Sequence, residues 1–297
     1  MEQSVQEQGG QRTTRVATSL SMVDYSIFYR RPVAVNRIGR ELRSFDILIS
    51  AFNDSDRVRS VFSDVRASRK FWLIQPEYGY TPLEEPTGHT NVRPSKIDEV
   101  TQVNELLAQL GNIENRSICI DITGFMRHVL VFLVAKLAHI GVKEFTALYS
   151  EPMQYAKQEN TAFSTTTSGR PRTVMGMAGS PHSGRDYLII AVGYDHKLIS
   201  EVSNHKDSST VYPVFAFPSL SPDMYQQSAV RASRSGDIAR SEDWLSSRRF
   251  APANDPFSTA AVVGDIVREI DRRGEPANIY LAPLSTKVQA LGFAVFW

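Results

Sequence analysis

The chain has only one cysteine, Cys119, among its 297 residues, and it has no long uninterrupted apolar run. A single cysteine excludes an intramolecular disulfide, so the fold cannot depend on covalent cross-links. A membrane-spanning helix needs about 20 consecutive apolar residues, whereas the longest apolar stretch, 129–142, is interrupted by Lys136 and His139. We therefore expect a cytoplasmic protein without a membrane partner.

The sequence also lacks an excess of charge of either sign and the short motifs of metal and cofactor sites. Its 33 Lys and Arg residues balance 32 Asp and Glu residues to a formal net charge of +1, which argues against a general electrostatic grip on nucleic acid. The six histidines show no metal-ligand spacing, and HExxH and GxSxG are absent. The glycine-rich fingerprints GxGxxG and GxxxxGKS/T are absent as well. We expect no metal and no cofactor.

What the sequence does contain is a regular alternation of apolar strand-like runs and segments with helical spacing. In the first half, strands are predicted at 45–52, 70–75, 116–122 and 143–150, and helices at 57–68, 96–111 and 125–140. In the second half, strands are predicted at 186–195, 210–217 and 278–283, and helices at 196–205, 221–233, 256–273 and near the C-terminus. This alternation predicts an α/β fold of two Rossmann-like lobes with mainly parallel sheets.

The domain organisation follows from where this alternation stops and restarts. Residues 1–20 form a polar tail that we expect to be flexible, and 21–150 form the first lobe. Residues 151–184 are rich in Ser, Thr, Gly and Pro, so we predict a linker or long loop there. The second lobe then covers 185–297, within which 232–254 is predicted to be irregular.

The two halves resemble each other, which suggests an internal duplication. When Asp46 is placed on Asp186, "DILISAF" at 46–52 aligns without gaps with "DYLIIAV" at 186–192, and Trp72 falls on Tyr212. When Ile118 is placed on Ile279, "ICIDITGFMRHVLVFLV" aligns without gaps with "IYLAPLSTKVQALGFAV". Any two βα units share buried apolar strands, so the ungapped spacing carries more weight than the identities. Two such lobes are expected to face each other across a cleft.

The first candidate binding residues lie at a strand end, because ligands of open parallel sheets bind beyond the carboxyl ends of the strands. Thr123 and Gly124 follow a predicted strand and precede a helix. The free N–H groups and positive dipole end of such a helix favour a phosphate, and Arg127 and His128 in its first turn can add charge-assisted hydrogen bonds. The alternative is a plain strand-to-helix turn in which Thr123 caps the helix and Arg127 is solvated.

Ser285, Thr286 and Lys287 occupy the matching place in the second lobe. A lysine at a helix N-terminus opposes the helix dipole, so it costs stability unless an anion is near. The sequence therefore favours Lys287 as a second phosphate contact. The alternative is an ordinary exposed lysine.

Other strand ends supply the remaining candidates. Asn53 is a candidate ligand contact, Asp54 and Glu77 are candidate acid or base groups, and Tyr78 and Tyr194 are candidates for stacking on a base. The alternative for Asn53 and Asp54 is capping of the following helix. The alternative for Glu77 and Tyr78 is a solvated loop.

The segment "DITGFMR" at 121–127 resembles the Asp/Asn-x-Thr-Gly-Gly-Thr-Lys turn of CRISPR-associated Rossmann-fold (CARF) sensor domains. A fused pair of such lobes resembles the related SAVED sensors of bacterial antiphage signalling. The resemblance implies a cyclic oligonucleotide ligand, ligand-binding roles for Thr123, Gly124, Arg127 and Lys287, and a separate effector protein. This sequence departs from the pattern, because Phe-Met replaces Gly-Thr, Arg127 replaces lysine, and the second lobe lacks Thr-Gly.

Three hypotheses about function remain open at this point. The first is a nucleotide-binding sensor or regulatory protein of antiphage defence, with its ligand held between the lobes. Assembly into a homo-oligomer is an open alternative to a monomer. The second is an enzyme that hydrolyses or transfers a nucleotide or small phosphorylated metabolite, with Glu77 or Asp54 as acid or base and His128 as proton carrier. The third is a subunit of a multi-protein assembly whose lobes bind no ligand.

Overall fold

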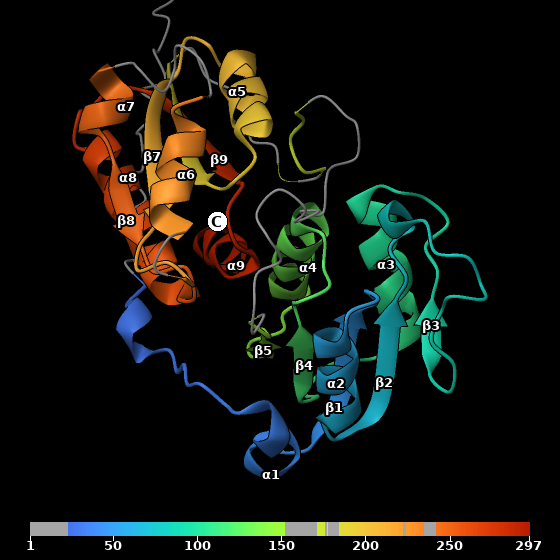
Figure 1. Ribbon diagram of the computed structural model, residues 1–297. Helices are drawn as coiled ribbons and strands as arrows, with labels where there is room; N and C mark the ends of the chain where they lie inside the picture. Colours follow the sequence, from blue (N-terminus) through green and yellow to red (C-terminus); the bar gives the residue numbers. More distant parts are fainter. Residues whose placement is uncertain (1–22, 152–170, 176, 178–183, 222–223, 235–241) are drawn as a thin grey trace, which may run out of the picture.

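A computed structural model describes residues 23–151, 171–175, 177, 184–221, 224–234 and 242–297 (Figure 1). The predicted tail at 1–20 and most of the predicted linker at 151–184 lie outside the described residues. Within the described ranges, no helix is long and apolar enough to cross a membrane.

The sheet of the first lobe has five parallel strands in the spatial order β3-β2-β1-β4-β5. The strands are β1 (Phe45–Ala51), β2 (Ala67–Leu73), β3 (Thr90–Val92), β4 (Ile118–Asp121) and β5 (Thr146–Leu148). The helices are η1 (Tyr25–Ile27), η2 (Val35–Arg37), α1 (Ile38–Glu41), α2 (Asp56–Asp64), η3 (Pro76–Tyr78), α3 (Glu99–Leu110) and α4 (Arg127–His139). The chain runs outward from β1 to β3 and then places β4 on the other side of β1. The strand order therefore reverses between β1 and β4.

The sheet of the second lobe has four parallel strands in the spatial order β8-β7-β6-β9. The strands are β6 (Arg185–Val192), β7 (Thr210–Ala216), β8 (Arg249–Ala251) and β9 (Ala277–Pro283). The helices are α5 (His196–His205), α6 (Met224–Ala232), α7 (Glu242–Ser246), α8 (Pro256–Asp271) and α9 (Lys287–Phe296). Here the strand order reverses between β6 and β9.

The two sheets share one topology, which confirms the predicted pair of Rossmann-like lobes and supports the internal duplication. The order β3-β2-β1-β4 corresponds strand for strand to β8-β7-β6-β9. Ile49 pairs with Ile120 in the first sheet, and Ile189 pairs with Leu281 in the second. The structure thus reproduces the predicted alignment of β1 with β6 and of β4 with β9, because Ile189 is the counterpart of Ile49 and Leu281 is the counterpart of Ile120.

One predicted correspondence is wrong by a single residue. Ile49 pairs with Phe71 and Ile189 pairs with Tyr212, so Tyr212 corresponds to Phe71 and not to Trp72. Phe71 lies in the same apolar cluster as Ile49, whereas Trp72 lies on the opposite face of the sheet. Successive side chains of a strand point to opposite faces, so a one-residue slip exchanges the two faces. Both faces of this sheet are buried, and hydrophobicity alone could not detect the slip.

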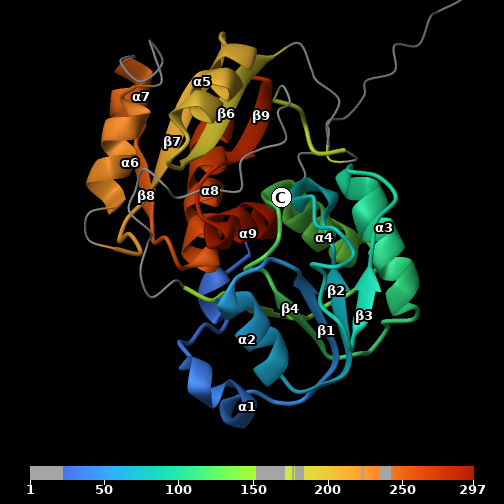
Figure 2. The same cartoon turned by 45° about the vertical axis from the view of Figure 1, so that its right-hand side comes forward.

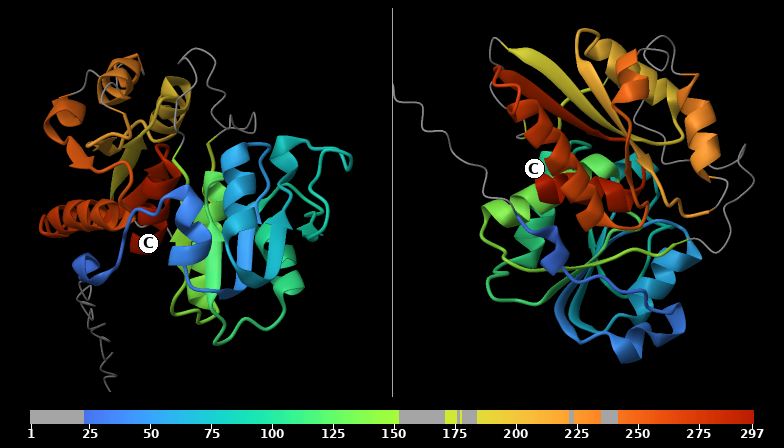
Figure 3. Two further views of the ribbon diagram at one scale, coloured as in Figure 1. Left: turned by 60° about the horizontal axis from the view of Figure 1, so that its bottom comes forward. Right: turned by 90° about the vertical axis from the view of Figure 1, so that its left-hand side faces the viewer.

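Helices α4 and α9 lie side by side between the two sheets and join the lobes (Figures 2 and 3). Six consecutive residues of α4, from Val129 to Val134, are buried, as expected for a helix inside a core. In α9, Leu291 belongs to the apolar core of the first lobe, whereas Phe293 belongs to that of the second. Because α3 packs on α4 and α8 packs on α9, one helical layer runs from one sheet to the other.

The segment that precedes β1 makes a second connection between the lobes. At its start this segment packs against α8, where Phe28 stacks on Phe257 with ring centroids 4.9 Å apart. It then runs to α1 beside the first sheet (Figure 1). Arg30 is 3.6 Å from Asp255, the N-cap residue of α8. The two lobes are therefore held together at two separate places.

Several short elements differ from the sequence-based expectation. The region 232–254, predicted to be irregular, contains α7 and β8, and β3 occurs in a segment with no strand prediction. The strand predicted at 143–150 shortens to β5. Three-residue strands contain too few residues for a period of two to be visible, so only the pairing with a neighbour reveals them.

Candidate functional site

The carboxyl ends of β4 and β9 lie next to the points where the strand order of each sheet reverses, and each strand leads directly into a helix that joins the lobes. Doubly wound sheets bind ligands beyond the carboxyl ends of the strands at such points. In this protein α4 and α9 begin there and pack against each other. The turn before α4 and the turn before α9 are therefore brought together.

The turn after β4 is held by hydrogen bonds of its own residues. Asp121 accepts from the backbone N–H of Thr123 at 3.0 Å and from the hydroxyl of Ser50 at 2.9 Å. The buried Thr123 hydroxyl accepts from the backbone N–H of Ser150 beyond β5. The N-cap residue of α4 is Met126, so Thr123 is not the helix cap that the alternative interpretation required. Its buried side chain links the residues that follow β4 to those that follow β5 by a hydrogen bond.

Gly124 is required by the close approach of two strand ends. A Cβ atom at this position would lie 1.9 Å from the carbonyl oxygen of Ala51 at the end of β1. The hydroxyl of Tyr78 donates to the carbonyl of Gly124 at 2.8 Å, and the Asn53 side chain hydrogen-bonds to the same tyrosine. Tyr78 also stacks on Tyr80 with ring centroids 5.7 Å apart. Tyr78 thus supports the turn, and the base stacking predicted for it stays a prediction.

Two cations connect the facing turns across the lobe boundary in a reciprocal way. Arg127, the first residue of α4, donates from Nε to the carbonyl oxygen of Ser285 at 2.7 Å. Lys287, the first residue of α9, donates from Nζ to the carbonyl oxygen of Thr123. Thr286 is the N-cap of α9, accepting from the N–H of Gln289. The two predicted turns therefore face each other in hydrogen-bonded contact.

A third cation, Arg57 in the first turn of α2, lies close to Lys287. Its guanidinium donates to the carbonyl oxygen of Ser150 at 3.0 Å and hydrogen-bonds to Tyr149. We call Arg57, Arg127 and Lys287 the cation cluster. Arg57 was not among the residues predicted from the sequence, although its position just after the end of the first strand indicates a place near the site.

The cation cluster has little compensation by negative charge. In the part of the chain that the structure describes, none of its three members forms an ion pair with a carboxylate. Burial, together with the neighbouring Arg127 and Arg57, lowers the pKa of Lys287 to about 7, and the nearby Asp121 carboxylate opposes this effect. Burial also lowers the pKa of Arg127 and raises the pKa of the nearby Asp121 carboxyl. The part of the Lys287 shift that comes from Arg127 and Arg57 indicates an excess of positive charge, which an anion would neutralise.

Glu77 and His128 form a second polar group on the first-lobe side of α4. His128 Nε2 lies 2.9 Å from Glu77 Oε1, and Gln102 donates to the same oxygen at 2.9 Å. The Glu77 side chain is only 2% exposed, and its other oxygen, Oε2, has no hydrogen-bond partner within the described residues. Two candidate residues of the enzyme hypothesis, Glu77 and His128, are therefore in contact, and their acid–base roles stay predictions.

The structure does not bring the other predicted residues into one site. Asp54 is exposed, and its carboxylate pairs with Arg59 at 2.5 Å, whereas Glu77 is in contact with His128. Asp54 does not cap α2, since Ser55 occupies that position without a side-chain cap bond. The Tyr194 ring in the second lobe has the guanidinium of Arg231 5.3 Å from its centroid. Among the described residues, no group of three His, Cys, Asp or Glu side chains is arranged to hold a metal ion.

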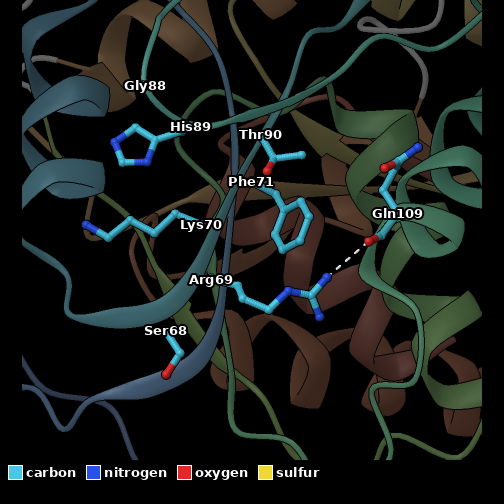
Figure 4. A pocket seen from close by; sticks show the side chains of 8 residues that line it. All are labelled: Ser68, Arg69, Lys70, Phe71, Gly88, His89, Thr90 and Gln109. Carbon is cyan, nitrogen blue, oxygen red and sulfur yellow. Dashed lines mark hydrogen bonds between the residues drawn. The ribbon is translucent and has the colours of Figure 1, made fainter.

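A shallow hollow of roughly 650 Å³ lies near the amino ends of β2 and β3, away from the cation cluster (Figure 4). Its two cations are satisfied by backbone carbonyls. Arg69 donates to the carbonyls of Gln109 and Leu110 at the end of α3, and Lys70 donates to carbonyls near the end of α2. Cations commonly stabilise helix C-termini in this way, so a role in stabilising α2 and α3 accounts for Arg69 and Lys70 without a ligand.

No protein-family model, curated protein or solved structure matches this chain.

Proposed function

We propose that this protein is a sensor or regulatory protein that binds a nucleotide or short oligonucleotide at the junction of its two lobes. The observation that carries the proposal is the cation cluster, which gathers three cations without carboxylate partners among the described residues, where two helix N-termini meet. Phosphates are the anions best suited to this combination of guanidinium, ammonium and free helical N–H groups.

The contacts between the lobes support rather than prevent phosphate binding. Arg127 uses Nε for the carbonyl of Ser285, so its terminal NH₂ groups can serve a bidentate interaction. Lys287 uses one of its three donors for the carbonyl of Thr123. Each carbonyl positions a cation that belongs to the opposite lobe, so neither lobe contains the complete site.

The resemblance of "DITG" to the CARF turn supports the more specific part of the proposal. On this basis the ligand is a cyclic oligonucleotide, the pathway is antiphage defence, and the response is passed to a separate effector protein. Arg127 and Lys287 would hold phosphates, whereas Thr123 and Gly124 would support them through the geometry of the turn.

Thermal-shift measurements followed by calorimetry, with mono-, di- and cyclic oligonucleotides, test the proposal. We expect at least one class to raise the melting temperature of the wild type, and the Arg127→Ala, Lys287→Ala double variant to lose this response. The matched control is Arg59→Ala, Lys197→Ala, which removes two exposed cations of α2 and α5. Circular dichroism confirms that each variant is folded. Unchanged affinity in the double variant at the junction would refute the site.

A second candidate, an enzyme acting on the same ligand, is favoured by one observation. Glu77 presents a buried oxygen without a partner among the described residues, next to its contact with His128, as a general acid–base pair requires. Chromatography of nucleotide incubations would detect turnover, which Glu77→Gln should abolish while binding persists. Binding without any product favours the sensor, and no response to any nucleotide favours the ligand-free subunit.

A further inference from the structure

The second lobe exposes two phenylalanine rings near the carboxyl ends of its neighbouring strands β7 and β8. Phe217 follows β7 directly and is 53% exposed, and Phe250 in β8 is 45% exposed. Their ring centroids are 6.3 Å apart, and Tyr225 of α6 contacts both rings at 5.3 Å and 6.0 Å. We call Phe217 and Phe250 the aromatic platform.

Core packing explains the lower part of this aromatic group but not the platform itself. Phe215 and Trp244 lie beneath it and are both 2% exposed. Phe215 contacts Tyr225, Trp244 and Phe250, which fixes the platform on a rigid base. The two platform rings nevertheless leave about half of their surface in solvent. Exposed large apolar side chains gathered at one place commonly mark a binding surface.

A series of hydrogen bonds fixes the platform relative to the cation cluster. The N–H of Phe217 donates to the carbonyl of Ala251 at 2.9 Å, and the N–H of Ala253 donates to the carbonyl of Pro218 at 2.9 Å. The hydroxyl of Thr286 then donates to the carbonyl of Ala253 at 2.8 Å. Thr286 immediately precedes Lys287 in the chain. The loops after β7, β8 and β9 are thus joined into one edge, with aromatic rings at one end and a member of the cation cluster at the other.

We propose that the aromatic platform stacks on a nucleobase of the ligand whose phosphate is held by the cation cluster, an inference that rests on the proposed function. A base offers a flat π-face to Phe217 or Phe250, and stacking of this kind tolerates every base. The position at the carboxyl edge of the sheet is where doubly wound folds place their ligands. A phosphate at Lys287 and a base at the platform make a nucleotide, rather than a simple phosphate, the chemical class that this edge selects.

Binding measurements with and without a base test the inference. The probes are adenosine and uridine nucleotides on one side, and inorganic pyrophosphate and ribose 5-phosphate on the other. In Phe217→Ala, Phe250→Ala we expect nucleotide affinity to fall about tenfold and the affinity for base-free phosphates to stay unchanged. Phe217→Leu, Phe250→Leu keeps apolar bulk without a π-face and should lose most of the same affinity. Ile140→Ala, which alters an exposed apolar residue at the end of α4, is the control.

A second readout follows the base itself. A 2-aminopurine nucleotide should be quenched on binding to the wild type and should remain bright when bound to the double alanine variant. Nucleotide affinity and quenching that survive in both double variants overturn the platform while the proposed function stands. The Arg127→Ala, Lys287→Ala variant should lose binding of every phosphate probe, whereas the platform variants should lose only the nucleotides. This difference separates a test of the cation cluster from a test of the platform. If the wild type binds no nucleotide, or if the alanine variant only loses association with another protein chain, the inference is wrong.

Discussion

Anion binding by the cation cluster should depend on pH, because Lys287 is only partly charged near neutrality. Burial, followed by Arg127 and Arg57, lowers its pKa to about 7, and only Asp121 opposes this effect. A phosphate diester bound here brings negative charge within hydrogen-bond distance of the ammonium group. It therefore raises the pKa of Lys287, and binding takes up a proton.

The size of the effect follows from the titration of one lysine. With a pKa of about 7, about 90% of Lys287 is charged at pH 6 and about 10% at pH 8. If the charged form alone binds, the affinity falls about tenfold between these two pH values. The free energy of unfolding changes with pH in the opposite direction to the ligand affinity. Lysine with its ordinary pKa of 10.5 binds more protons in the unfolded chain, so the free energy of unfolding rises with pH above about 7.

Calorimetry at pH 6, 7 and 8, in buffers of different ionisation enthalpy, measures both the affinity and the proton uptake. The ligand must be a diester, because a phosphate monoester titrates near pH 6 itself. Lys287→Arg keeps its charge throughout and should bind with a flat pH profile, whereas Lys197→Arg should keep the wild-type slope. His128→Gln tests the histidine that follows Arg127 in the chain. A slope that survives in Lys287→Arg would refute the assignment to this lysine.

Three further predictions concern stability and reactivity. Gly124→Ala should lower the free energy of unfolding by more than about 3 kcal/mol in urea denaturation, since the added Cβ would lie 1.9 Å from a backbone carbonyl oxygen. The control is Gly264→Ala in α8, where the nearest atom to an added Cβ is 3.4 Å away, and it should change the free energy of unfolding little. Arg172→Ala should lower the free energy of unfolding by about 2 kcal/mol, because it removes the cation paired with the buried carboxylate of Glu99 and leaves the hydrogen bond from the Met175 N–H. Glu99 has a pKa lowered to about 2 from 4.5, with desolvation opposing the Arg172 hydrogen bond, so the wild-type advantage should be present above about pH 4.5 and disappear as the pH falls toward 2. Cys119, whose pKa is raised by burial to about 12, should not react with a thiol reagent at pH 8 until the protein is unfolded.

The fold was largely predictable because the strong signals in this sequence are long. Of the strands with seven or more residues, β1, β6, β7 and β9 appear at or close to their predicted positions, as does the helix α5, whereas β2 begins at Ala67, before its predicted start at residue 70. The two ungapped alignments of the halves also anticipated the matched topology of the sheets. Short elements such as β8 depend on tertiary pairing, which leaves no periodic trace in so short a segment.

The site was predictable where the position in the fold determines the role. Arg127 and Lys287 were selected from their places at helix N-termini, and the structure brings them into reciprocal contact with the facing turns; their binding of a ligand stays a prediction. Thr123 was assigned a ligand contact, but its hydroxyl is used by a neighbouring strand end. Local sequence cannot reveal such a partner, because the N–H group belongs to Ser150 beyond the next strand of the sheet.

The duplicated lobes have diverged around corresponding strand ends, and the divergence argues for an asymmetric ligand site. Arg57 belongs to the cation cluster, whereas Lys197, its counterpart when Asp46 is aligned with Asp186, is exposed. Beyond the second strand, the first lobe carries the buried Glu77 contact with His128, while the second lobe carries exposed Phe217. Two identical lobes would present the same side chains to both halves of a ligand. Here the first lobe supplies most of the positive charge and the second lobe supplies the aromatic surface, so the two halves of any ligand spanning the junction must be recognised differently.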